Sequence, residues 1–101
     1  MSKKVEWTIK AKTSLDQYCA IIEEYSSVNA KKVRREIVLA SKGLSKNPYL
    51  YQIDEYYPDN PGNIRRFFKW SYKIVYQVKE AKVTILEVYH TSRNPSDVGV
   101  N

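Results

Sequence analysis

Three side chains in the last third of the sequence have types and positions that suit phosphate or acid–base chemistry. Lys73 lies within a tyrosine-rich apolar stretch, and His90 and Arg93 follow the next apolar stretch. A histidine can act as a general base at neutral pH, which ribonuclease chemistry requires. An arginine beyond a strand end, stiffened by the following Asn94 and Pro95, can present its planar fork to a phosphate or a carboxylate.

Each of these residues also has a structural interpretation. His90 could stack or hydrogen-bond at the end of the sheet and hold the turn that follows it, and Arg93 could pair with Glu87 or Asp97. The sequence contains one histidine and one cysteine, so the usual His/Cys metal sites are effectively excluded. No glycine-rich phosphate loop is present either, and we expect no cofactor.

Two strands must position these side chains. Alternation from Tyr72 to Val78 places Tyr72, Ile74 and Tyr76 on one face and Lys73 on the other. The run from Val83 to Tyr89 has apolar residues at both parities, which is typical of a central strand covered on both faces. The polar connection at 79–82 joins the two runs into a hairpin.

Helices and a first strand are expected upstream. Val5, Trp7 and Ile9 alternate with polar residues and predict a strand. A capping box at 14–17 predicts a helix that ends near residues 26–27, with apolar residues at helical spacing. Asn29 can cap a second helix whose stripe is Val33, Ile37, Ala40 and Leu44, with Gly43 and Pro48 marking its end.

The predicted order is therefore β-α-α-β-β-β, an α+β fold in a single domain spanning residues 1–101. Residues 49–63 read as an irregular loop, and Arg65–Lys69 as a short basic strand. We expect a small mixed antiparallel sheet of about four strands, with the helical hairpin packed on one face. Lys73 and Arg65 should then emerge on the opposite face and form a concave basic surface.

Composition and charge limit the function classes. The chain has 101 residues and a net charge of +6, and no apolar run approaches the roughly 18 residues of a membrane span. Residues 31–46 contain six basic and one acidic side chain, as do residues 62–82. Such segments attract phosphate backbones or an acidic protein, although the basic residues of the second helix could simply be its solvated face. The single Cys19 and the absence of a visible secretory signal favour the cytoplasm.

The ordered motifs resemble the RelE/ParE superfamily of small bacterial toxins. The resemblance lies in the hairpin Tyr-Lys-Ile-Val-Tyr-Gln-Val at 72–78, the strand Val-Thr-Ile-Leu-Glu-Val at 83–88 and the ending His-Thr-Ser-Arg-Asn-Pro at 90–95. Asn47-Pro48-Tyr49 and Ile64–Phe68 also look like that family. The resemblance implies the toxin of a type II toxin–antitoxin (plasmid stabilisation) module, neutralised by a cognate acidic antitoxin.

Within the superfamily, the residues favour one branch over another. In the ribosome-dependent messenger-RNA endoribonucleases, basic residues on the concave sheet stabilise the transition state, and these positions fall on Lys73 and Arg93. Here Lys73 replaces the usual arginine, and no tyrosine follows Arg93. The ending from His90 to Pro95 looks more like the ParE branch, whose members act on DNA gyrase. RelE-like messenger cleavage, with Lys73, Arg93 and His90 as catalytic residues, and a non-toxic binding module that shares the fold remain alternatives.

Tyrosines suggest where a partner would bind. The sequence holds nine of them, more than so small a core can hide. We expect some to form an anchoring surface onto which an acidic segment of the antitoxin folds. The candidates for this surface are Tyr18, Tyr25, Tyr56 and Tyr57, while Arg65, Lys73 and Arg93 are the candidates for contact with a target or nucleic acid.

Overall fold

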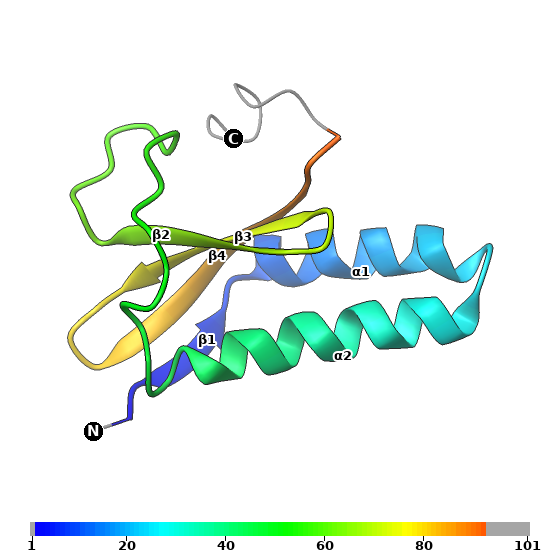
Figure 1. The fold of residues 1–101 in the computed structure, drawn as a ribbon, viewed down its shortest axis with the longest axis horizontal. Helices are drawn as coiled ribbons and strands as arrows, with labels where there is room; N and C mark the ends of the chain where they lie inside the picture. Colours follow the sequence, from blue (N-terminus) through cyan, green and yellow to red (C-terminus); the bar gives the residue numbers. More distant parts are fainter. Residues whose placement is uncertain (1, 93–101) are drawn as a thin grey trace.

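Two helices and a four-stranded sheet make up the computed structural model, which describes residues 2–92 (Figure 1). The sheet has the order β1-β4-β3-β2, with β1 parallel to β4 and the other neighbours antiparallel. The predicted α+β fold and its element order are confirmed. The elements are β1 (Lys4–Trp7), α1 (Ile9–Glu23), α2 (Ser27–Gly43), β2 (Ile64–Lys69), β3 (Tyr72–Val78) and β4 (Lys82–His90).

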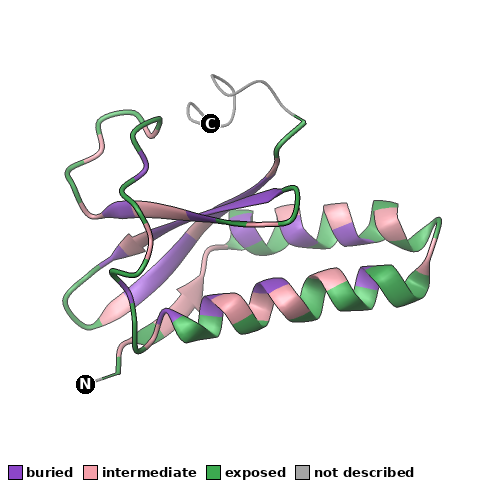
Figure 2. Cartoon of the chain, viewed as in Figure 1, coloured by how far each residue is buried: buried purple, intermediate pink, exposed green. Residues whose placement is uncertain are grey.

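Strand β4 is central, as its apolar residues at both parities predicted. It lies between β1 and β3, and most of its residues are buried (Figure 2). The first strand, which lacks a hairpin partner, adds in parallel to β4, with Val5 opposite Val83. An irregularity between Val75 and Tyr76 shifts the register of β3 against β4. Such a bulge bends the strand and increases its local twist.

Helix α1 begins earlier than the capping box at Ser14 predicted. The N-cap is Thr8, whose Oγ1 accepts a hydrogen bond from the Ala11 N–H at 3.0 Å. Ile9, expected in the first strand, is therefore the first residue of the helix and is 84% exposed. Ser14 lies within the helix and donates to Glu87 Oε1 at 2.8 Å instead of capping. The prediction failed because a strand leading directly into a capped helix leaves no turn signal between them.

Helix α2 also begins earlier than predicted, at Ser27 rather than after Asn29. Ser26 is the N-cap, and its side chain accepts from the Asn29 N–H at 3.1 Å. The predicted stripe is confirmed, since Ile37 and Leu44 are buried and Val33 and Ala40 pack against the same core. The turn end of the helical hairpin extends beyond the sheet, and residues 23–25 and 27–29 are exposed there (Figure 2).

The loop between α2 and β2 wraps around the edge strand β2. On the helix side, Tyr51 stacks on Phe67 with ring centroids 5.0 Å apart. Along the edge, the Arg66 N–H donates to Gln52 O and the Asp54 N–H donates to Ile64 O. On the other face, the Asp54 side chain reaches Lys73. This loop therefore covers the sheet face that the helices leave open.

Candidate partner-binding surface

Lys73 lies on the helix-free face, as alternation predicted, but it does not emerge there. Its side chain is 5% exposed and its Nζ lies 3.1 Å from Asp54 Oδ2. The Asp54 carboxylate is fully buried and also accepts the Tyr56 N–H at 3.0 Å, and the Tyr56 ring lies 5.5 Å from Lys73 Nζ. The prediction that Lys73 forms part of an exposed, concave basic surface is therefore wrong, because the Asp54 carboxylate neutralises Lys73 and the loop covers it.

Arg65 lies on the opposite face from the one predicted. The register places it across from Tyr76, and directly opposed residues of an antiparallel pair share a face. Tyr76 belongs to the core beneath the helices. The Arg65 guanidinium donates to Tyr51 O at 2.6 Å and lies 5.1 Å from the Tyr49 ring. Arg65 thus anchors the loop on the helix side, and the structure does not bring it together with Lys73.

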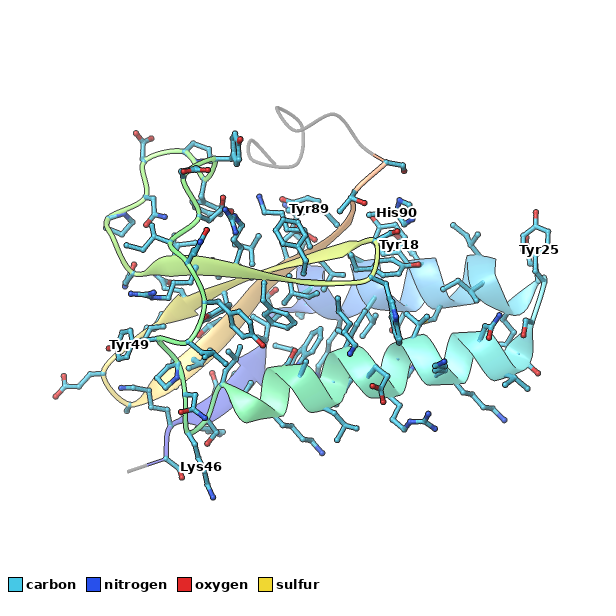
Figure 3. The ribbon with its side chains drawn as sticks, viewed as in Figure 1. Tyr18, Tyr25, Lys46, Tyr49, Tyr89 and His90 are labelled. Carbon is cyan, nitrogen blue, oxygen red and sulfur yellow. The ribbon has the colours of Figure 1, made fainter. Side chains whose placement is uncertain are left out.

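His90 is held in the way that the structural interpretation predicted. The Ser92 N–H donates to His90 Nδ1 at 3.1 Å, and Ser92 Oγ lies 2.7 Å from the same nitrogen. The imidazole meets Tyr72 edge-on, with ring centroids 5.2 Å apart. Tyr18 also contacts this corner, because its hydroxyl oxygen accepts the His90 N–H at 3.1 Å (Figure 3). Arg93 lies outside the described residues, and its proposed role stays a prediction.

A groove of about 380 Å³ lies between helix α1 and the end of the sheet. Burial raises the pKa of the Tyr72 phenol, which forms part of the groove wall. The groove has an apolar rim, since Ile21 is 57% exposed. Its lining residues are Tyr18, Ile21, Ile22, Tyr72, His90 and Ser92. This groove is a candidate anchoring site for a partner's apolar side chains.

The four tyrosines predicted to bind the antitoxin do not form one cluster. Tyr18 lines the groove, whereas Tyr25 is 86% exposed at the turn end of the helical hairpin (Figure 3). Tyr56 is exposed on the loop, and Tyr57 packs against the small core on the helix-free face. The structure thus brings only Tyr18 together with His90. Ile21 was missed, although its position on α1 next to the helical stripe would have suggested it.

Surface ion pairs neutralise part of the positive charge of α2. Arg34 Nη1 lies 2.7 Å from Asp16 Oδ1 and joins the two helices, and Asp16 raises the Arg34 pKa through this hydrogen bond. Glu87, which the sequence offered as a partner for Arg93, is buried and pairs with Lys10 at 2.9 Å. Asp54 was the most important residue that the sequence did not predict, since an irregular loop carries no periodic signal.

The arrangement of helices and sheet is shared with solved structures of other bacterial proteins. A chain from the chromosomal ParDE toxin–antitoxin system of P. aeruginosa superimposes with a TM-score of 0.70 at 21% identity, covering 88% of this chain and 96% of that one. A conserved hypothetical protein from Helicobacter pylori, solved in solution, gives a TM-score of 0.57 at 14% identity, covering 92% and 98%. At such identities these likenesses concern the fold alone.

The sequence itself defines the family. The family model of the ParE toxin of type II toxin–antitoxin systems, parDE, matches residues 5–95. Comparison with curated protein sequences gives no significant match. The chain belongs to the ParE toxin family, which confirms the superfamily resemblance. Among the described residues, no helix is long and apolar enough to cross a membrane.

Proposed function

We propose that the protein is a cytoplasmic toxin that inhibits DNA gyrase and is neutralised by an acidic antitoxin encoded beside it. Membership of the ParE family supports a toxin that acts on a topoisomerase rather than on messenger RNA. The observation that carries the choice of target class is the covering of the helix-free sheet face by the loop around Asp54.

A ribonuclease of this superfamily would need cations exposed on that face. Lys73 is buried there and neutralised by Asp54, so its ammonium group cannot reach a phosphate without opening the loop. Arg66 of β2 lies on the same face, and its side chain is 15% exposed and lies 3.8 Å from Glu55. Transition-state stabilisation requires donors already aimed at the developing charge. The described residues do not provide such a set on this face.

His90 also lacks the surroundings of a general base. Its Nδ1 is occupied by Ser92, and no carboxylate within residues 2–92 pairs with the ring. A general base must lie within hydrogen-bond reach of its proton and is usually oriented by another group. Here the ring stacks against Tyr72 and closes the end of the groove. This supports a structural and partner-binding role for His90.

An antitoxin is supported by the charge and by the uncovered apolar surface. The net charge of +6 attracts an acidic chain over a long range. Ile21, Tyr25 and Val28 are each more than half exposed at the turn end of the helical hairpin, and the groove with Tyr18 lies beside Ile21. An acidic segment that folds on binding would cover this surface and pay its ordering entropy from the area buried.

The decisive experiment compares the wild-type protein with a variant whose buried pair is replaced by apolar residues, Asp54→Leu/Lys73→Met. We expect both proteins to inhibit DNA supercoiling by purified gyrase equally, and neither to cleave messenger RNA in a translation extract. If the sheet worked on RNA, removal of Lys73 would reduce cleavage about 100- to 1000-fold. Messenger cleavage by the wild type that disappears in this double variant would overturn the proposal.

A further inference from the structure

The turn between β2 and β3 holds an aromatic side chain in a backbone conformation that disfavours it. Trp70 and Ser71 form the two-residue connection between the paired residues Lys69 and Tyr72. The φ angle of Trp70 is +50°. Glycine and asparagine are the residues usually found there, because a β-carbon makes left-handed backbone unfavourable. A bulky residue retained in such a conformation, and half exposed, suggests that the side chain has a use.

Basic side chains surround this aromatic residue. Trp70 is 53% exposed, and the Nζ atoms of Lys69 and Lys32 lie 4.9 and 5.8 Å from its ring. On the other face of β2, Phe68 is also 53% exposed, with the Arg66 guanidinium 5.4 Å from its ring. We call the three residues on the helix side, Lys32, Lys69 and Trp70, the β2–β3 tip. Aromatic and arginine side chains of this kind are enriched among the residues that dominate interface energies.

The chemistry of the tip fits an acidic polypeptide better than a nucleic acid. Glu36 lies 3.7 Å from Lys69. A phosphate backbone presents negative charge at every step, so it would place charges against the Glu36 carboxylate as well as against the lysines. A polypeptide can instead place its acidic side chains near Lys32 and Lys69 and an apolar side chain against Trp70.

The tip also continues the surface already described. Tyr72 follows the turn directly and lines the groove with Tyr18 and Ile21. Its ring lies 5.5 Å from that of Tyr18, which ties the start of β3 to helix α1. A segment seated in the groove would therefore meet the tip within a few residues.

We infer that the β2–β3 tip is an anchor for an acidic segment of the antitoxin, with Trp70 as its principal contact. The inference rests on the antitoxin of the proposed function, and it does not depend on the identity of the toxin's target. Contacts with Lys69 and Lys32 already hold the half-exposed indole in place before binding, so less side-chain freedom is lost when the partner arrives.

Trp70→Gly tests the inference because glycine suits the turn and removes the contact. The probe is the purified product of the acidic reading frame adjacent to this gene, titrated calorimetrically into full-length protein. We expect binding about 10- to 100-fold weaker than wild type, with an unchanged or raised thermal midpoint because the turn is relieved. Asp59→Gly is the matched control, since Asp59 is the other non-glycine residue with positive φ among the described residues, at +54°, and is exposed on the loop. The Asp59→Gly variant should bind the probe with the same affinity as the wild type.

Other outcomes separate this inference from the proposed function. Wild-type affinity in Trp70→Gly would overturn the inference alone, and failure of the wild type to bind the probe would overturn both. If Trp70→Gly lowers the thermal midpoint, Lys32→Glu, which leaves the turn intact, should still weaken binding several-fold, and no change there would overturn the inference. Binding of a (dT)20 oligonucleotide that is lost in Trp70→Gly would also overturn it. If the wild-type protein binds the probe but does not inhibit gyrase, the proposed target is overturned and this inference stands.

Discussion

The two faces of strand β3 are both buried, but they are covered by different kinds of structure. On one face Ile74 and Tyr76 pack beneath the helical hairpin in an apolar core. On the other face Val75 belongs to a small cluster with Tyr89, and beside it Lys73 pairs with Asp54 under the loop. A helical hairpin covers a sheet by repeated apolar contact, whereas this loop combines the apolar contact of Tyr57 with a buried ion pair and backbone hydrogen bonds.

This difference matters for the proposed function, because the loop occupies the face on which messenger cleavage would need open cations. An ion pair is a costly way to cover a sheet, since two charges lose their hydration. Its partners must therefore meet with good geometry, and here the distance is 3.1 Å, with the Tyr56 N–H as a further donor to Asp54. Removing one of the two charges should therefore detach the loop from its face of the sheet before the helical hairpin separates from the other face.

The largest effect is expected from breaking the pair with Asp54→Ala. This change leaves Lys73 buried without a counter-charge and should lower the free energy of unfolding by about 3–5 kcal/mol in urea denaturation. The double variant Asp54→Leu/Lys73→Met should recover most of this loss, because neither charge is then buried. Asp16→Ala, which breaks the exposed pair with Arg34, serves as the control and should cost about 1 kcal/mol or less. A cost for Asp54→Ala as small as the control's would contradict the comparison.

Neighbouring core residues on β3 test whether the two covers differ in rigidity. Ile74 and Val75 are both fully buried, one beneath the helices and one beneath the loop. Ile74→Ala should cost about 3–4 kcal/mol, because the packed helices leave a cavity. Val75→Ala should cost about 2 kcal/mol or less. This cost should also be smaller per removed carbon than that of Ile74→Ala, because the loop can move into the space. Equal costs per removed carbon in equilibrium unfolding would mean that the loop is as rigid as the helices.

A smaller effect should appear at alkaline pH through Tyr76. Its hydroxyl donates to Pro48 O at 3.0 Å, and burial raises its pKa to about 12. The unfolded phenol titrates near pH 10, so its contribution is fully present below pH 10 and is lost as pH rises toward 12. The loss should be about 3 kcal/mol, and Tyr76→Phe should remove this part of the slope while costing about 1 kcal/mol at neutral pH. Identical alkaline slopes in both proteins would show that Tyr76 does not ionise on unfolding.

Periodicity predicted the strands and the helical stripe because it reflects which side of an element faces the core. The alternation in β3 and the two-sided burial of β4 followed from residue types alone. Element boundaries were less certain, since Thr8 and Ser26 cap the helices at junctions without a distinctive turn signal. Arg65 was assigned to the wrong face for a similar reason. Which residues of the short basic strand β2 face the helices is decided by its pairing with β3.

The amino-acid sequence by itself determined the order of the elements, the basic charge and the family, because these depend on residue types and their spacing. Only the tertiary structure decided what covers each face of the sheet. Asp54 lies 19 positions before Lys73, in a loop without periodicity, and it reaches the strand only because the chain wraps around β2. Whether Lys73 is a surface cation or a buried, neutralised one therefore depends on a contact between distant segments, which local patterns do not encode.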